Sequence, residues 1–253
     1  MIHRKSMEQI EYIRTCGQIV FAVQKKLEAL VEPGVTTSHL DAVAEAAIRE
    51  TGARPAFKGY HGFPASICAS VNASIVHGFP TDEPLSEGDI VSIDVGVELG
   101  GYFGDGAFTV GVGAISGDAS DLIAVTHRCL ELGIEHMRVD GRIGDISHAI
   151  QTHAEAAGYS IVREYGGHGI GRELHESPHI NNYGQAGKGP RLKVGHVFCI
   201  EPIISMKSPE IEHADDGWTV YTSDRSLTAH SEHTVALTEE GPQILTLPPA
   251  TAA

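Results

Sequence analysis

Two acidic residues stand eleven positions apart in a segment that otherwise has the character of buried β-structure. Asp94 lies between Ile93 and Val95, and Asp105 follows the glycine pair at 100–101. If the chain turns between them, the two carboxylates lie directly opposite each other on paired strands, with Cβ atoms about 5 Å apart. Like charges at that spacing are destabilising, and an uncompensated charge is costly to bury. The pair therefore predicts a cation site.

The segment that carries Asp94 occurs twice. Residues 85–94 read LSEGDIVSID and residues 192–201 read LKVGHVFCIE, so each copy has Leu, two variable residues, Gly, and an apolar strand that ends in Ile and an acid. Glu201 takes the place of Asp94 in the second copy, and Pro202 after it marks a strand edge or a bulge. We therefore expect two related halves with a metal or catalytic site between them.

Two further residues complete a set of metal ligands. His168 lies among glycines in GGHGIG, where small neighbours leave an imidazole open to a metal. Glu232 lies in SEHTVAL, where strand alternation places it on the face of Thr234, although a solvent-facing glutamate fits the alternation equally well. Two Asp, two Glu and one His suit a pair of Mn²⁺, Fe²⁺, Co²⁺ or Zn²⁺ ions. Two such ions can activate a water for attack, which is hydrolytic chemistry.

The elements that must position these residues follow the same order twice, two helices and then strands. A capping box at Ser6 and Gln9 predicts a helix that runs to Pro33-Gly34, and Thr36 or Thr37 opens a second helix that ends near Gly52. In the second half, helices are expected from Ser116 or Asp118 to Met137 and from Asp145 to Gly158. Strands are expected at 66–72, 90–97, 102–112, 197–205, 218–221 and 230–237.

This order predicts an α+β fold with a central antiparallel sheet and outer helices. We expect a single domain at 1–247, built of pseudo-symmetric halves at 1–115 and 116–247, with a loosely ordered tail at 248–253. No run of about 18 apolar residues occurs, which argues against a membrane span. The charged N-terminal segment does not resemble a secretory signal, so we expect a cytoplasmic protein.

Charge and cysteine content argue against several further classes of function. The 253 residues carry a formal net charge of −15, and no lysine cluster or basic tail provides the cationic density that nucleic-acid binding requires. The four cysteines are far apart and never form CxxC, which argues against a zinc ribbon and a redox pair.

Six segments, taken in order and at matching intervals, resemble the signature segments of type I methionine aminopeptidases. They are GYHGFPASICASVN, IVHGFP, SIDVGVELGGYFGD, GGHGIGRELHESP, IEP and GWTVYTSDRSLTAHSEHT. The resemblance covers nearly the whole chain. It implies the pita-bread fold and a monomeric enzyme that removes the N-terminal methionine from nascent proteins and peptides when the second residue is small. The five metal ligands that it implies are Asp94, Asp105, His168, Glu201 and Glu232.

The same resemblance assigns further roles. Glu201 would take a proton from the attacking water as well as bind metal, and His77 and His175 would flank the two ions and contact the scissile peptide. The methionine pocket would be lined by Tyr60, His61, Phe63, Cys68 and Trp218. The chain departs from common family residues at Phe57, Phe103, Gly106 and Leu174, which bears on pocket shape and on hydrogen bonds around the metal.

Two alternatives stay open beside this interpretation. Xaa-Pro aminopeptidases and dipeptidases share the fold and the five ligands, but they carry a large N-terminal domain for which the early position of Asp94 leaves no room. A non-catalytic pita-bread protein that binds a partner would typically have lost metal ligands. For an enzyme that meets nascent chains, transient docking to the ribosome would use a local basic patch at Lys188, Arg191 and Lys193.

Overall fold

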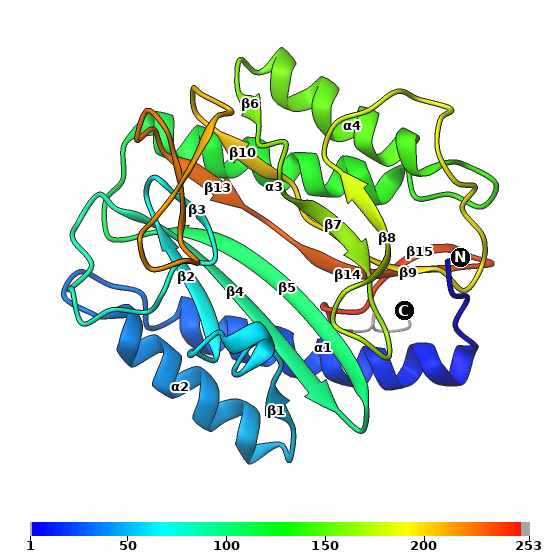
Figure 1. Cartoon of the computed structure of the whole chain (residues 1–253), viewed down its shortest axis with the longest axis horizontal. Helices are drawn as coiled ribbons and strands as arrows, with labels where there is room; N and C mark the ends of the chain where they lie inside the picture. Colours follow the sequence, from blue (N-terminus) through cyan, green and yellow to red (C-terminus); the bar gives the residue numbers. More distant parts are fainter. Residues whose placement is uncertain (1, 249–253) are drawn as a thin grey trace.

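The computed structural model describes residues 2–248 as an α+β body in which helices cover antiparallel sheets. Helices α1 (Met7–Glu28) and α2 (Thr37–Glu50) lie on one side of the strands, and α3 (Gly117–Glu135) and α4 (Ile143–Ala156) lie on the opposite side (Figure 1). The predicted α+β architecture is confirmed. The tail expected at 248–253 falls, apart from Pro248, outside the described residues.

Strands of the described residues pair into four antiparallel sheets. The first half of the chain contributes β1 (Arg54–Pro55), β2 (Ile67–Val71), β3 (Ser74–Val76), β4 (Ile90–Leu99) and β5 (Tyr102–Gly111), with a 3₁₀ turn at Tyr60–Gly62. The second half contributes β6 (Ser160–Ile161), β7 (Gly166–Gly169), β8 (Glu176–Asn181), β9 (Val197–Ile200), β10 (Ile203–Ser205), β11 (Ile211–His213), β12 (Val220–Thr222), β13 (Thr228–His230), β14 (His233–Thr238) and β15 (Gly241–Ile244).

The helix starts follow the capping signals of the sequence. Ser6 caps α1 through the predicted box with Gln9, and Thr36 and Ser116 accept hydrogen bonds at the starts of α2 and α3. Helix α1 ends at Glu28, five residues before the predicted stop, and the chain passes through a short turn before Pro33, which disfavours helical backbone in the residue before it.

Helix α4 begins two residues earlier than predicted, at Ile143. The Asp145 carboxylate accepts a hydrogen bond from the backbone N–H of Arg142 at 2.7 Å, so the acid stabilises the helix start from inside the first turn. The sequence signal was therefore real, but it marks the third residue of the helix and not its first.

Helix α1 lies close against the β4–β5 hairpin because the hairpin carries glycine where the helix crosses it. A Cβ atom on Gly104 would lie 2.8 Å from the backbone nitrogen of Gly17, nearer than side-chain atoms approach in proteins. Around this crossing the helix buries an apolar face that includes Ile13, Val20 and Leu27. The close contact fixes the position of the hairpin that carries Asp105.

The register of that hairpin differs from the one predicted. Gly100 and Gly101, both with positive φ, form the two-residue turn, and Leu99 pairs with Tyr102. Asp94 therefore lies opposite Ala107, and Asp105 lies opposite Gly96. The prediction of directly opposed carboxylates was wrong because the turn is centred one residue later than assumed. The two acids are instead diagonal neighbours on the same face of the sheet.

In the second half, two predicted strands are each divided at an acid. The stretch 197–205 breaks at Glu201-Pro202 between β9 and β10, and the stretch 230–237 breaks at Ser231-Glu232 between β13 and β14. His233 pairs with Ile200 and His230 pairs with Ile203, so the register is the same on both sides of the interruption. Glu201 and Glu232 consequently lie opposite each other, and both residues are outside the regular strands.

The repeated segment adopts the same structure in both copies. Gly88 and Gly195, with φ of 96° and 91°, start the strands β4 and β9 from left-handed turns. Each donates its backbone N–H to the far strand of its own half, Gly88 to the Val112 carbonyl and Gly195 to the Leu237 carbonyl. The pseudo-twofold relation predicted from the repeat is therefore visible in the hydrogen bonds.

The two halves meet where β5 passes the β13–β14 interruption. Ala107 and Glu232 exchange backbone hydrogen bonds in both directions. On either side of this pair, Thr109 Oγ1 hydrogen-bonds the backbone N–H and C=O of His230, and Thr234 Oγ1 does the same to Asp105. The junction is thus itself pseudo-symmetric, and its backbone groups at Asp105, Ala107, His230 and Glu232 are hydrogen-bonded across the two halves.

Each half has its own apolar core. One lies between α1, α2 and the β4–β5 hairpin, and the other lies under α3 and α4 against β9, β10 and β14. Within residues 2–248, no helix combines the length and apolar character needed to cross a bilayer.

Candidate metal centre

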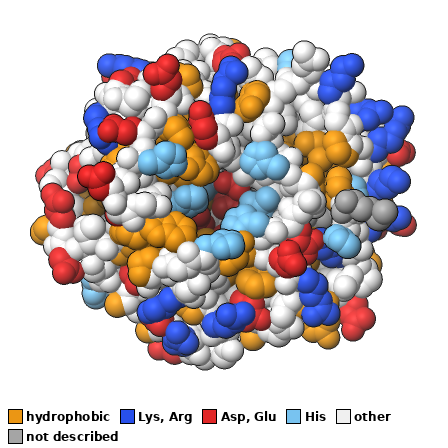
Figure 2. Space-filling model, in the orientation of Figure 1, with side chains coloured by type: hydrophobic (Ala, Val, Ile, Leu, Met, Phe, Trp, Pro, Cys, Tyr) orange, Lys and Arg blue, Asp and Glu red, His pale blue; other side chains and the backbone are white. Residues whose placement is uncertain are grey.

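A cavity of about 670 Å³ opens between the two halves of the molecule. Figure 2 shows acidic side chains at the bottom of a hollow with several histidines at its rim. All twelve residues selected from the sequence line this cavity, although they come from segments far apart in the chain. They are Tyr60, His61, Phe63, Cys68, His77, Asp94, Asp105, His168, His175, Glu201, Trp218 and Glu232.

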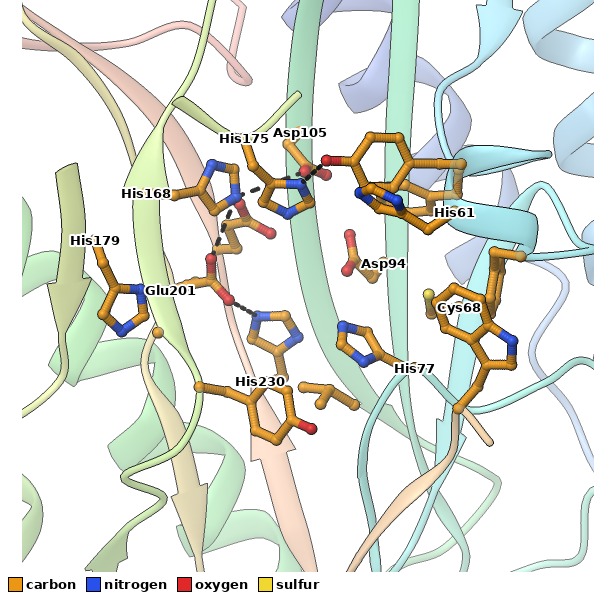
Figure 3. A pocket seen from close by; sticks show the side chains of 18 of the residues that line it. His61, Cys68, His77, Asp94, Asp105, His168, His175, His179, Glu201 and His230 are labelled. Carbon is orange, nitrogen blue, oxygen red and sulfur yellow. Dashed lines mark hydrogen bonds and ion pairs between the residues drawn. The ribbon is translucent and has the colours of Figure 1, made fainter. Parts of the chain in front are cut away.

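The five predicted metal ligands meet on the floor of the cavity (Figure 3). Asp94 and Asp105 come from the first half, and the other three come from β7 and from the two strand interruptions of the second half. Ligand atoms of Asp105, His168 and Glu232 lie within 4.8 Å of one another. Side chains from both halves are therefore needed to build the cluster.

His168 presents one ring nitrogen to the acids. Its Nδ1 lies 2.9 Å from the carbonyl oxygen of Gly169, which can only accept, so Nδ1 carries the proton. In the neutral ring, Nε2 then has a free lone pair, and it lies 3.5 Å from Glu201 Oε1 and 4.0 Å from Asp105 Oδ2. A second bond that fixes the tautomer in this way is the usual arrangement of a metal-binding histidine.

Burial and mutual repulsion raise the pKa of three carboxyl groups. Burial, opposed in part by the His230 imidazole, raises the pKa of Asp94 to about 6. Burial together with the charges of neighbouring acids raises the pKa of Asp105 and of Glu232 well above their usual range. In the absence of a cation, this cluster therefore holds protons that exposed carboxylates would have lost.

Glu201 differs from the other acids. Burial raises its pKa, but the imidazoles of His230, His168 and His175 outweigh burial and bring the pKa below its usual value. Its backbone is also fixed, since the Asn182 side-chain amide donates to the Glu201 carbonyl at 2.8 Å. Glu201 is therefore the acid of this cluster that stays ionised most readily.

The residues present fit a pair of divalent cations. Among the described residues, Asp94 Oδ1 and Glu232 Oε1 are buried and have no hydrogen-bond partner, which is costly for a carboxylate and unnecessary in a purely structural site. The donor set is rich in oxygen with one imidazole nitrogen, as first-row divalent ions prefer. A cation would satisfy the orphaned oxygens and remove the repulsion between the acids.

Cys199 also lies within the 4.8 Å cluster, and the sequence analysis did not select it. Burial and the neighbouring acids raise the pKa of its thiol well above the usual value, so the sulfur keeps its proton. Its Sγ lies 3.7 Å from Thr234 Oγ1. We infer that Cys199 supports the acids as a weak donor, whereas the carboxylates and His168 provide the ligand atoms.

Two further histidines lie beside the acids. His175 Nδ1 lies 2.9 Å from the Tyr60 hydroxyl, and its ring centroid is 4.3 Å from that of His168. Burial, with a contribution from the charge of His168, lowers the pKa of His175 to about 4, and burial also lowers the pKa of His77. Both rings are therefore neutral near pH 7 and can hydrogen-bond a ligand without adding charge.

His77 is held in an unusual backbone conformation. Its φ of 58° is in the left-handed region, and a Cβ on the next residue, Gly78, would lie 2.5 Å from the carbonyl oxygen of Ala69. Backbone strain of this kind costs about 1–3 kcal/mol and is concentrated at functional sites. In Figure 3 the His77 ring lies beside Asp94 in the cavity.

One wall of the cavity is apolar. The ring of Phe63 packs edge-on against Trp218, with centroids 5.2 Å apart, and Cys68 is paired across the strands with Asp94. Asp216 fixes the Trp218 segment by accepting hydrogen bonds from the backbone N–H groups of Trp218 and Thr219 at 2.8 Å. The cavity thus joins an apolar surface directly to the acid cluster.

Residues that the sequence analysis did not assign also line the cavity, among them Tyr165, His179 and His230. For His230 a signal was present, because residues two apart in a strand share a face and Glu232 was already selected. Of the four departures from common family residues, Phe57 lines the cavity, and Phe103, Gly106 and Leu174 do not.

Comparisons with known proteins agree with this geometry. The model of metallopeptidase family M24 matches residues 11–239. This chain belongs to that family. It is 49% identical over 247 residues to a methionine aminopeptidase of Clostridium perfringens, a match that covers 98% of this chain and 99% of the relative.

Solved structures of two peptidases have the same fold. A methionine aminopeptidase of Rickettsia prowazekii superposes with a TM-score of 0.96 at 42% identity, over 98% of this chain and all of the other. A prolidase of Pyrococcus furiosus superposes with a TM-score of 0.79 at 22% identity, over 97% of this chain and 66% of the other, which shows the fold alone. The pita-bread fold expected from the sequence is confirmed.

Removal of one carboxylate tests whether the acid cluster is built for a cation. We expect Asp105→Asn to lower the affinity for Mn²⁺ at least about tenfold in calorimetric titration of metal-stripped protein. The same change should raise the free energy of unfolding of the metal-free protein by about 1 kcal/mol in urea, because Asn is neutral without a proton, whereas burial and neighbouring acids raise the pKa of Asp105 on folding.

Asp82→Asn is the matched control, since Asp82 is exposed and does not line the cavity. It should leave both quantities unchanged. A metal-free Asp105→Asn protein that is less stable than the wild type, with unaltered Mn²⁺ affinity, would show that Asp105 has a structural role.

Proposed function

We propose that this chain is a methionine aminopeptidase that removes the N-terminal methionine from peptides and nascent polypeptides whose second residue is small. One observation carries the proposal: an acid cluster and an apolar wall share one cavity in a chain that matches methionine aminopeptidases over nearly its full length. The reaction is hydrolysis of the first peptide bond.

The acid cluster would hold two divalent ions through Asp94, Asp105, His168, Glu201 and Glu232. Bound there, the ions would supply an activated water and an electrophile for the carbonyl of the first peptide bond. Glu201 is the member of the set whose pKa lies below its usual value, so its carboxylate is available to accept a proton from the attacking water. The free amino group of the substrate would lie on the same floor of the cavity.

The two neutral histidines would orient the substrate. When the Tyr60 hydroxyl donates to Nδ1 of His175, Nε2 carries the proton and can donate to the oxygen of the scissile peptide. His77, held at the cavity by its left-handed backbone, would contact the same peptide from the other side. Both contacts place the carbonyl carbon near the water without adding a positive charge.

The apolar wall would receive the methionine side chain. A thioether makes favourable contacts with aromatic rings and with a polarisable sulfur, and Phe63, Trp218 and Cys68 offer both. Tyr60 and His61 border the same space from a segment in which Gly59, His61 and Gly62 all have positive φ. That local backbone projects two rings over the cavity.

A peptide assay tests this function directly. With Mn²⁺ or Co²⁺ present, the purified protein should release methionine from Met-Ala-Ser and leave Met-Leu-Ser intact, because the site accepts only a small second residue. Ala-Pro-Ser serves as the substrate for the alternative Xaa-Pro activity, since prolidases share the fold. Liquid chromatography with mass detection measures the products.

Preferential cleavage of Ala-Pro-Ser would overturn the proposal in favour of an Xaa-Pro peptidase. Absence of cleavage with every divalent metal, from protein that binds metal, would favour a non-catalytic pita-bread protein.

We further propose that the chain acts in the cytoplasm as a monomer and docks transiently to ribosomes through a basic patch. The segment between β8 and β9 exposes three basic side chains, Lys188, Arg191 and Lys193. Arg191 donates to the Asp140 carbonyl on the connection between α3 and α4. That connection also carries Arg138, which is exposed and adds a fourth basic side chain to the patch. Figure 2 shows basic side chains gathered at one edge of the molecule. Such a patch offers ribosomal RNA a local attraction that the net charge of −15 does not.

Reversal of the three predicted charges tests the docking site. The variant with glutamate at 188, 191 and 193 should sediment with bacterial ribosomes at least about tenfold less at low salt, because several phosphate contacts are lost. Cleavage of Met-Ala-Ser should be unchanged. Lys25→Glu with Lys26→Glu on α1 is the control, and equal binding by both variants would exclude the patch.

A further inference from the structure

His230 is a buried imidazole on the cavity floor to which neither the sequence analysis nor the proposed mechanism gives a role. It is the last residue of β13, it is 3% exposed, and its Nε2 is buried without a hydrogen-bond partner within the described residues. A buried nitrogen left without a partner is costly, and such groups in native structures usually have a functional explanation.

The backbone of His230 is held by the same kind of threonine hydrogen bonds as the backbone of Asp105. Thr109 Oγ1 donates to the His230 carbonyl at 2.8 Å and accepts from its N–H at 2.9 Å. Thr234 Oγ1 makes the equivalent pair of bonds to Asp105, at 2.8 Å and 3.0 Å. His230 therefore occupies, in the second half of the molecule, the position that Asp105 occupies in the first.

Of the two equivalent positions, 105 thus carries a carboxylate and 230 carries an imidazole. A carboxylate at 230 would have added a further negative charge to a cluster in which the pKa of Asp94, Asp105 and Glu232 is already raised. An imidazole adds no negative charge, and one of its ring nitrogens can donate a hydrogen bond to a neighbouring acid.

The acid that His230 contacts is Glu201. His230 Nε2 lies 3.6 Å from Glu201 Oε2, and His168 Nε2 lies 3.5 Å from Glu201 Oε1, so two imidazoles bracket one carboxylate (Figure 3). The Glu201 carbonyl is fixed separately by the Asn182 amide. This bond restrains the backbone of Glu201, so the direction of its carboxylate is set by the side-chain torsions and by the groups that the two oxygens contact.

We propose that His230 is a positioning residue for Glu201, whose Nε2–H donates to Oε2 and so turns Oε1 toward the metal centre. The distance of 3.6 Å closes to a hydrogen bond by a small rotation of either side chain. The bond satisfies the orphaned nitrogen and fixes the plane of the carboxylate. The role in catalysis rests on the proposed peptidase function, whereas the effect on metal binding does not.

Two amide variants separate this role from its alternatives. Gln at 230 places an amide N–H near the position of Nε2, whereas Asn is one methylene shorter and does not reach Oε2. We expect His230→Asn to bind Mn²⁺ about 10–100-fold more weakly than the wild type in calorimetric titration of metal-stripped protein, which is the usual loss when a partner of a metal ligand is removed. His230→Gln should stay within about threefold of the wild type.

Cleavage of Met-Ala-Ser gives the second readout. At saturating metal, His230→Asn should lower kcat about 10–100-fold, and His230→Gln should largely restore it. His196→Asn is the control for removal of a buried imidazole, because His196 is also 3% exposed but does not line the cavity. It should change neither Mn²⁺ affinity nor kcat.

Each other result overturns the proposal. Equal losses of Mn²⁺ affinity in both amide variants would identify His230 as a metal ligand, since an amide is a poor substitute for imidazole at either length. Wild-type affinity in both would give His230 a structural role. If the wild type cleaves no methionyl peptide, the proposed function fails, but the Mn²⁺ titrations still decide the role of His230.

Discussion

Repulsion among the carboxylates on the cavity floor is the interaction on which the rest of the structure depends. Asp94, Asp105 and Glu232 have raised pKa values because burial and neighbouring acids disfavour their charged forms. A fold can hold such groups together only if other interactions fix the backbone that carries them. The β4–β5 hairpin against α1 and the paired threonines at the junction of the halves supply that support.

The junction explains how a symmetric scaffold supports asymmetric chemistry. The repeated segments place Asp94 and Glu201 at equivalent points, and Thr109 and Thr234 hold equivalent neighbours. Yet Asp94 is one of the acids whose pKa is raised, and Glu201 is the acid whose pKa is lowered, because three imidazoles of the second half lie near it. The first half thus provides two acids with raised pKa, and the second half provides Glu232, whose pKa is also raised, together with Glu201, whose pKa is lowered.

Much of this arrangement could be predicted from the sequence, and the exceptions have physical causes. Caps such as Ser6 and the repeated Leu-x-x-Gly segments are local signals, so the starts of α1, α2 and α3 and the two related halves were correct, whereas α4 starts two residues before the predicted position. The hairpin register was wrong because a shift of one residue in the turn centre moves every pair of residues. Cys199 was missed because its contacts join strands distant in sequence, and no local pattern reports such distances. His230 was missed although it lies two residues from Glu232, and its contact with Glu201 depends on the pairing of distant strands.

The dependence of stability on pH tests the central account most directly. Between pH 7 and 8 the histidines with lowered pKa are neutral in both states, whereas the pKa of Asp105 and of Glu232 is raised well above the usual range in the folded state alone. An acid whose pKa is higher in the folded state loses its stabilising effect as the pH rises. The free energy of unfolding of metal-free protein in urea should therefore fall by about 1–3 kcal/mol over this range, and saturating Mn²⁺ should abolish the fall. A free energy that stays constant or rises with pH in the metal-free protein would contradict the account.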